Sequence, residues 1–124
     1  MNGDIILYSI LENFPEAYYY ILQSYGTLSF LAFGENCIHS QRGVQQGDPL
    51  GPFLFSLVIQ PLISSLTSQF NAWYLDDGTL AGPPSVVEND FIKIFENSHE
   101  LGLELNFSKC ELFFSITSLW FQIV

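Results

Sequence analysis

Basic residues are scarce in this chain. Its 124 residues contain three Lys and Arg against thirteen Asp and Glu, so the formal net charge is −10. Neutralising nucleic-acid phosphates takes Lys and Arg, so this charge excludes a basic DNA-binding module. Charged residues of both signs make up only 13% of the chain and hydrophobic residues 48%, a composition that disfavours intrinsic disorder. The length predicts one domain with a core of its own.

Cysteine is also rare. Cys37 and Cys110 lie far apart and form no C-x-x-C pattern, so neither a metal knuckle nor a disulfide framework is readable. Two free thiols favour a reduced, intracellular protein. The N-terminus carries Asp4 where a signal peptide would carry Lys or Arg, which argues against secretion.

Long uninterrupted apolar runs are missing as well. The uncharged stretches Ala17–Gly34 and Pro49–Leu75 are broken by Gly, Ser, Gln and Pro. A membrane-spanning helix needs about 20 predominantly apolar residues, and neither stretch supplies them cleanly. A membrane-associated protein that uses Pro49–Leu75 stays open as an alternative, although we expect no membrane partner.

Apolar periodicity and turn residues predict helices that alternate with hairpins. Helices are expected over 4–12, 15–25, 52–66 and 85–101, and hairpins over 28–41, 72–81 and 103–112. Ser85 and Glu88 read as a capping box, Gly102 as a helix end, and Asp77-Gly78 as a hairpin turn. The order predicts an α+β fold, an antiparallel sheet with helices packed on one face.

The pair Asp76-Asp77 is the first candidate for chemistry. Two adjacent carboxylates on a tight turn resist joint ionisation, and a hard cation such as Mg²⁺ relieves that repulsion. The alternative is that Asp76-Asp77-Gly78 forms an ordinary solvated turn with a structural role only.

Two further segments accompany this pair. Gln46 to Pro52 is a dense alternation of Gly and Pro that runs into an apolar helix, where backbone N–H groups can face an anionic ligand. Lys109, one of three basic residues, falls in a turn between two expected strands. A single turn Lys is usually just solvated.

Together these segments resemble the palm of reverse transcriptases of the retrotransposon type. The matching motifs, in the family's order, are GVQQGDPLGP at 43–52, YLDD at 74–77 and GLELN through KC at 102–110. The resemblance implies that Asp76 is a metal-ligating catalytic residue, with Asp77 as its less critical neighbour. It also implies that Lys109 lies near the departing pyrophosphate as a general acid.

The same resemblance implies binding roles for other residues. Tyr74 and Leu75 match positions near the primer end and the incoming nucleotide, and Gln46 and Gly47 match the segment that contacts the template. The complete enzyme would use Mg²⁺ or Mn²⁺ in two-metal phosphoryl transfer, with an RNA template, a DNA primer and a dNTP as partners.

The resemblance also defines what is missing. The family's palm needs a further aspartate on a neighbouring strand, which would precede Ile5, and we expect the fingers and thumb to be missing from residues 1–124. We therefore expect residues 1–124 to form an incomplete palm, inactive alone and with weak or no nucleic-acid binding. A rival hypothesis is a non-enzymatic acidic interaction module derived from a transposable element, since a charge of −10 suits a basic protein partner.

Overall fold

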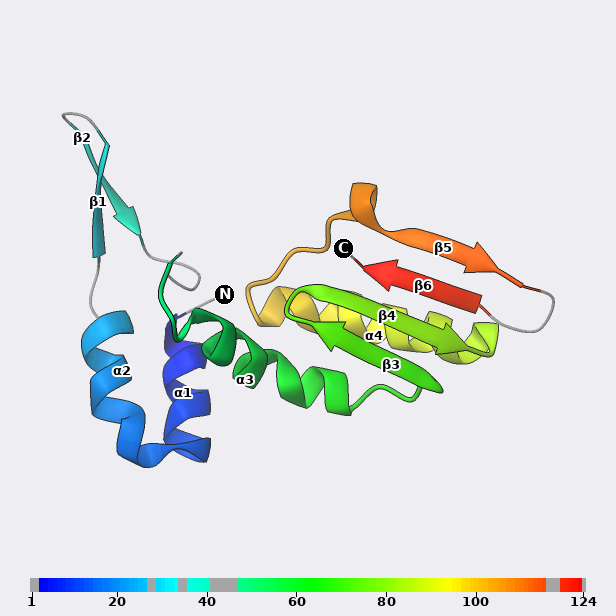
Figure 1. Cartoon of the computed structure of the whole chain (residues 1–124), viewed down its shortest axis with the longest axis horizontal. Helices are drawn as coiled ribbons and strands as arrows, with labels where there is room; N and C mark the ends of the chain where they lie inside the picture. Colours follow the sequence, from blue (N-terminus) through cyan, green and yellow to red (C-terminus); the bar gives the residue numbers. More distant parts are fainter. Residues whose placement is uncertain (1–2, 27–28, 34–35, 41–46, 116–118, 124) are drawn as a thin grey trace. The chain divides into compact units, whose positions relative to one another are not determined.

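The computed structural model describes residues 3–26, 29–33, 36–40, 47–115 and 119–123 (Figure 1). The chain divides into two compact units, Met1–Val58 and Ile59–Val124. Each unit is described by itself below.

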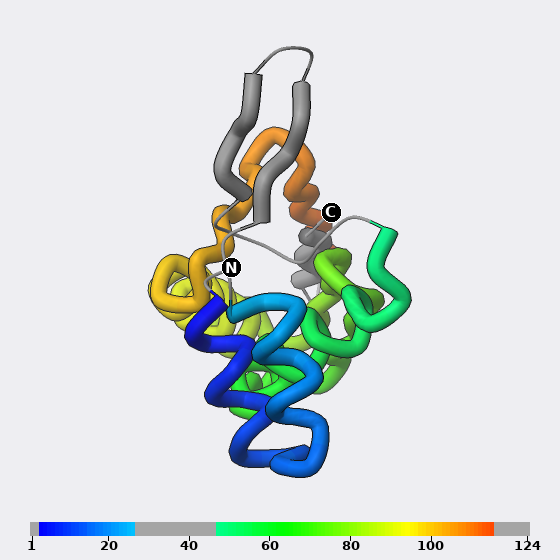
Figure 2. The backbone as a smooth tube through the Cα atoms, turned by 90° about the vertical axis from the view of Figure 1, so that its left-hand side faces the viewer, coloured from blue at the N-terminus to red at the C-terminus, as the bar shows by residue number. Residues whose placement is uncertain are grey.

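The first unit begins with a pair of helices. Helix α1 spans Gly3–Asn13, the 3₁₀ turn η1 spans Pro15–Ala17, and α2 spans Tyr18–Tyr25, as the periodicity predicts. Figures 1 and 2 show α1 and α2 side by side. Ile6 and Ile10, four residues apart on one face of α1, are fully buried, and Ile21 of α2 is buried too.

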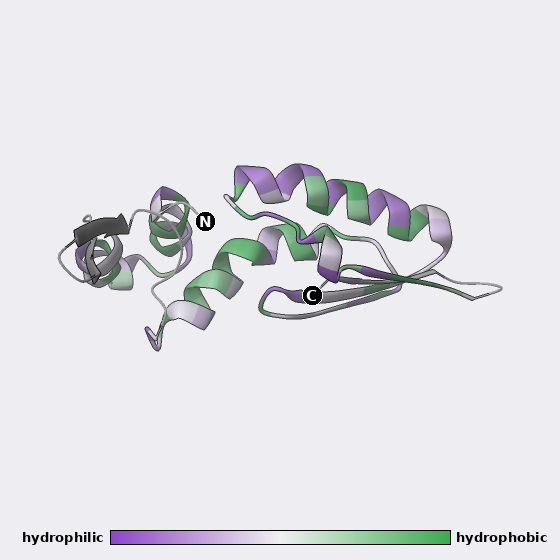
Figure 3. Cartoon of the chain, turned by 90° about the horizontal axis from the view of Figure 1, so that it is seen from above, coloured by the Kyte–Doolittle hydropathy of each residue, from purple (hydrophilic) through white to green (hydrophobic). Residues whose placement is uncertain are grey.

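A hairpin follows in the first unit, and then a helix whose residues belong partly to the first unit and partly to the second. Strands β1 (Ser29–Phe33) and β2 (Asn36–Ser40) pair antiparallel, as expected, but they form a two-stranded sheet of their own. Helix α3 (Gly51–Ser64) starts one residue before the predicted helix and stops two residues short of it, and it continues through Pro61. It is predominantly apolar (Figure 3). In the described part of the chain, no helix is both long enough and apolar enough to cross a membrane.

The second unit is a four-stranded antiparallel sheet covered by a helix. Strands β3 (Phe70–Tyr74), β4 (Asp77–Gly82), β5 (Glu111–Phe114) and β6 (Leu119–Ile123) take the order β3-β4-β6-β5. Helix α4 (Pro84–Glu100) lies along one face of this sheet (Figure 3). Leu80 of β4 packs with Val87 and Ile94 of α4 in the core, which confirms the α+β prediction.

The two ends of α4 differ in how well the sequence predicts them. Gly102 (φ 70°) ends the helix, and the bonds Gly102 N–H to His99 O (3.0 Å) and Leu103 N–H to Ser98 O (2.8 Å) form a Schellman motif. The capping box is wrong, because the helix already begins at Pro84 with no side-chain cap. Proline needs no N–H partner in the first turn, so Ser85 lies inside the helix.

The third hairpin also differs from the prediction. Residues 103–105 form no strand, and β5 pairs with β6. The reason is local: Asn106 Oδ1 accepts from Ser108 N–H (3.2 Å) and Oγ (2.6 Å), which closes the 3₁₀ turn η2 (Phe107–Lys109). Leu105, just before this turn, packs against the core, and residues 103–105 do not pair with another strand.

Candidate functional site

The turn between β3 and β4 carries the two candidate carboxylates. Tyr74 pairs with Asp77 at the end of the ladder, so Leu75 and Asp76 are the two central residues of the turn. The predicted turn at Asp77-Gly78 is therefore misplaced, because both residues already belong to β4. Asp76 stands at the tip of the hairpin, and Asp77 is the first residue of the strand that follows it.

Leu75 adopts an unusual backbone conformation in this turn. Its φ of 55° is the only positive value at a non-glycine residue in the described part of the chain. For an L-residue this conformation costs about 1–2 kcal/mol. Such strain persists only where the surroundings enforce it, and it concentrates at functional sites. Here the five residue pairs of the β3–β4 ladder enforce it.

The side chains of the turn face solvent, and hydrogen bonds hold the strand residues behind it in place. Asp76 and Asp77 are exposed, and 77% of Tyr74 is exposed. Behind them, the Trp73 ring lies over buried Gly78, and its indole N–H donates to Asn71 Oδ1 (2.7 Å). Asn71 in turn donates to the Ile63 carbonyl (3.0 Å). The carboxylates thus face solvent from a rigid base.

Lys109 lies at the same end of the sheet as this turn. It directly precedes β5, whose Glu111 pairs with Gln122 of β6, and Gln122 also pairs with Thr79 of β4. Two strand spacings separate β4 from β5, a lateral distance of about 10 Å. The Lys109 side chain is exposed. The structure therefore places the three predicted catalytic residues, Asp76, Asp77 and Lys109, at the same end of the sheet.

The described residues do not fit a two-metal centre. No group of three or more His, Cys, Asp or Glu side chains that could hold a metal occurs among them. The two neighbours of β4 are β3 and β6, and their sequences FNAWY and LWFQI contain no carboxylate. Adjacent carboxylates on an exposed turn supply too few ligands for two ions that each require near-octahedral coordination.

The predicted template segment belongs to the other unit. Gln46 lies outside the described residues, and Gly47 is exposed with φ 88°. Asp48 next to it organises the start of α3: its Oδ1 accepts from Leu50 N–H (2.9 Å) and its carbonyl from Gly51 N–H (3.0 Å). Its Oδ2 accepts a short hydrogen bond from the Tyr25 hydroxyl of α2.

We predict that Tyr25→Phe loosens this segment. The hydrogen bond from Tyr25, then that from Leu50 N–H, hold the pKa of Asp48 below its ordinary value of 3.8. Removing the hydroxyl is expected to cost about 1 kcal/mol above pH 4 and to raise the pKa of Asp48, and NMR titration of the carboxyl carbon measures the shift. Because the folded-state pKa is lowered, this stabilisation is lost as pH falls through it. Tyr20→Phe, on the exposed side of α2, is the control; an unchanged Asp48 titration in Tyr25→Phe would contradict the assignment.

Asp90 of α4 is a further carboxylate of structural importance that the sequence motifs do not indicate. It is 3% exposed and accepts hydrogen bonds from the backbone and hydroxyl groups of Thr67 and Ser68, in the segment that enters β3. The available signal was its spacing, three residues after Val87 and four before Ile94, on the buried face of the helix.

Comparison with known proteins identifies the family of the chain. The profile of the family described as "Reverse transcriptase (RNA-dependent DNA polymerase)" matches residues 9–122. The chain belongs to the reverse transcriptase family. The retrotransposable element SLACS 132 kDa protein of Trypanosoma brucei gambiense is 36% identical over an alignment of 99 residues, which covers 74% of this chain and 8% of that protein. No solved structure matches the chain.

The family match covers the motifs described above. The reverse transcriptase domain is of the retrotransposon type, and the chain spans only a small part of the length of the relative it matches. The Tyr74–Asp77 turn and the Gly47–Gly51 segment both fall within the matched residues.

Proposed function

We propose that the chain is a palm segment of a retrotransposon RNA-directed DNA polymerase, with the Tyr74–Asp77 turn at its catalytic edge. The observation that carries this is the strained two-residue turn, which holds two exposed carboxylates at the sheet edge shared with Lys109. In this role Tyr74 and Leu75 lie against the primer end and the incoming dNTP, while Gln46 and Gly47 contact the RNA template.

In the complete enzyme, other segments supply the remaining metal ligands and the basic residues that bind the nucleic-acid strands. Because the described residues do not fit a two-metal centre, the remaining ligands for Mg²⁺ or Mn²⁺ come from outside them. Lys and Arg that grip the strands also come from elsewhere, since this chain has three. The chain alone is then inactive, binds nucleic acid weakly or not at all, and acts inside the cell.

Exposed apolar side chains on the second unit support the proposal that other protein segments pack against it. Along β5, Leu112 is 51% exposed, Phe113 52% and Phe114 72%, and Phe70 on β3 is 46% exposed. Three consecutive exposed apolar side chains on the edge strand β5 favour cover by another protein segment at that edge.

A chimera tests the proposed function. The matching segment of the trypanosome relative is replaced by this chain, and primer extension on a primed RNA template is measured. We expect incorporation that falls at least tenfold in Asp76→Asn, and no such loss in Glu88→Gln, which changes an exposed carboxylate of the same unit outside the three motifs. The isolated chain is expected to match its own Asp76→Asn variant. Incorporation by the isolated chain above that variant would refute its inactivity, and a chimera indifferent to Asp76→Asn would refute the catalytic role.

A further inference from the structure

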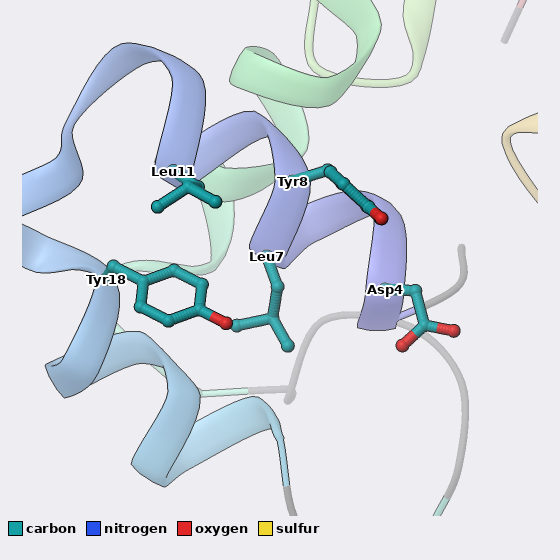
Figure 4. A pocket seen from close by; sticks show the side chains of 5 residues that line it. All are labelled: Asp4, Leu7, Tyr8, Leu11 and Tyr18. Carbon is teal, nitrogen blue, oxygen red and sulfur yellow. The ribbon is translucent and has the colours of Figure 1, made fainter.

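A cavity of about 250 Å³ lies on the paired helices of the first unit. Its lining comes from four residues of α1 and one of α2: Asp4, Leu7, Tyr8, Leu11 and Tyr18 (Figure 4). Figure 4 shows Tyr18 reaching from α2 toward Leu7, with Asp4 and Leu11 at opposite ends of the set. The cavity contains none of the residues assigned to the polymerase site, and it is smaller than the roughly 300–1,000 Å³ of small-molecule sites. Its size suits a single side chain.

The charged residues that the structure describes on α1, η1 and α2 are all acidic. Asp4, Glu12 and Glu16 are exposed on this helical pair, and residues 3–26 contain no Lys or Arg. With a net charge of −10 over the chain, the field at this surface attracts cationic partners and repels phosphates.

The same pair of helices carries several solvent-exposed tyrosines, of which Tyr8 lines the cavity. Tyr8 is 75% exposed, Tyr19 80% and Tyr20 64%, and Leu11 is 49% exposed. Tyrosine rings offer a face for a cation and an apolar wall for an alkyl chain, and they are enriched at protein interfaces. A carboxylate at one end and leucines along the wall match a ligand with a cationic head and an aliphatic stem.

We propose that this cavity binds an arginine side chain from a basic protein segment. Arginine fits better than lysine because its planar guanidinium stacks on an aromatic ring while it bonds a carboxylate in a bidentate manner. Its three methylene groups lie along Leu7 and Leu11 while the head group reaches Asp4 and Tyr8. This surface is independent of the polymerase role, so the two can fail separately.

The test uses the full chain and a designed probe, a blocked peptide of alternating Arg and Gly. Its dissociation constant is measured by calorimetry, and the contacted residues by NMR shifts. We expect the Arg peptide to bind at least threefold more tightly than its Lys counterpart and the neutral citrulline version not to bind. Asp4→Asn and Tyr8→Ala should each weaken binding at least fivefold, with shifts confined to α1 and α2. Both side chains are exposed, so both variants are expected to keep the wild-type circular dichroism spectrum.

Glu100→Gln is the matched control, because it removes one exposed negative charge from α4 of the other unit. It should change the dissociation constant by less than twofold. Equal weakening by Glu100→Gln and Asp4→Asn would reduce the effect to net charge and overturn the proposal. So would an NMR response of these tyrosines to primed RNA template in place of the peptide, or self-association of the chain through this face.

Discussion

Asp90→Asn is expected to destabilise the second unit by about 3 kcal/mol at neutral pH. The Asp90 carboxylate accepts from Ser68 N–H and Oγ (both 2.6 Å), from Thr67 N–H at both oxygens (3.0 and 2.8 Å) and from Thr67 Oγ1 (3.2 Å). Hydrogen bonds to a charged group contribute about 1.5–3 kcal/mol, and a buried donor left without a partner costs about 1–3 kcal/mol. An amide has one acceptor oxygen, and its NH₂ group would face these donors, so several of them would lose their partner.

The location of Asp90 makes this loss structural for the candidate site. Thr67 and Ser68 lie between α3 and β3, and Ser68 is buried. One turn along α4, Lys93 Nζ donates to the Ser65 carbonyl (2.9 Å) and fixes the same segment from its exposed side. Releasing this segment frees the entry of β3, the strand that leads to Asp76. Both tryptophans belong to the second unit, so fluorescence during urea unfolding reports on it selectively.

The effect of Asp90→Asn should depend on pH. Burial acts to raise the pKa of Asp90, but the hydrogen bonds from Ser68 and Thr67 together outweigh it and hold the pKa below 3.8. A carboxyl group whose folded-state pKa is lowered stabilises the fold above its unfolded-state pKa and loses that effect as pH falls through the folded-state value. The stability difference between wild type and Asp90→Asn should be constant from pH 5 to 7 and shrink below about 3.8.

Glu96→Gln is the control for Asp90→Asn. It makes the same chemical change on an exposed position of the same helix and should cost less than about 0.5 kcal/mol. Equal urea midpoints for Asp90→Asn and wild type at pH 6 would show that the buried network does not stabilise the fold.

The local part of this architecture is readable from the sequence. Apolar spacing predicts α1, α2, α3 and α4 within a few residues, and Gly102 ends α4 as expected because only glycine accepts its φ of 70° without strain. The hairpin signal at Asp77-Gly78 predicts β3 and β4 but places the turn too late. The pairing of Trp73 with Gly78 decides the register, and that pairing depends on a packed core.

In the candidate site, too, the sequence predicts the local features and not the long-range contacts. The motif at 74–77 indicates the carboxylates directly, since the turn that carries them is local. Contacts between distant residues gave no comparable signal: Tyr25 and Asp48 are 23 positions apart, and so are Thr67 and Asp90. The sheet order, with β6 between β4 and β5, is likewise set by tertiary pairing. Periodicity within one segment cannot specify either.

Gly78→Ala should cost the second unit about 2 kcal/mol and disturb the base of the carboxylate turn. A Cβ atom at this position would lie 2.6–2.7 Å from three atoms of the Trp73 ring. The ring cannot move aside easily, because its N–H is bonded to Asn71 and its surface packs against Leu80, Val87 and Ile94. Overpacking of this kind typically costs about 1–3 kcal/mol. Urea unfolding followed by circular dichroism measures the loss.

The partner variant Trp73→Leu separates this clash from a backbone effect. Leucine leaves the space over Gly78 open, so Gly78→Ala should be nearly neutral when Leu replaces Trp73, and the double-mutant cycle should show a coupling of at least about 1.5 kcal/mol. A purely conformational cost of losing glycine would be the same in both backgrounds, and additive effects would therefore contradict the packing explanation. Strong coupling means that the residue after Asp77 is glycine because a tryptophan from the facing strand occupies the place of its side chain. The carboxylates then owe their fixed position to a ring on the neighbouring strand as much as to the turn itself.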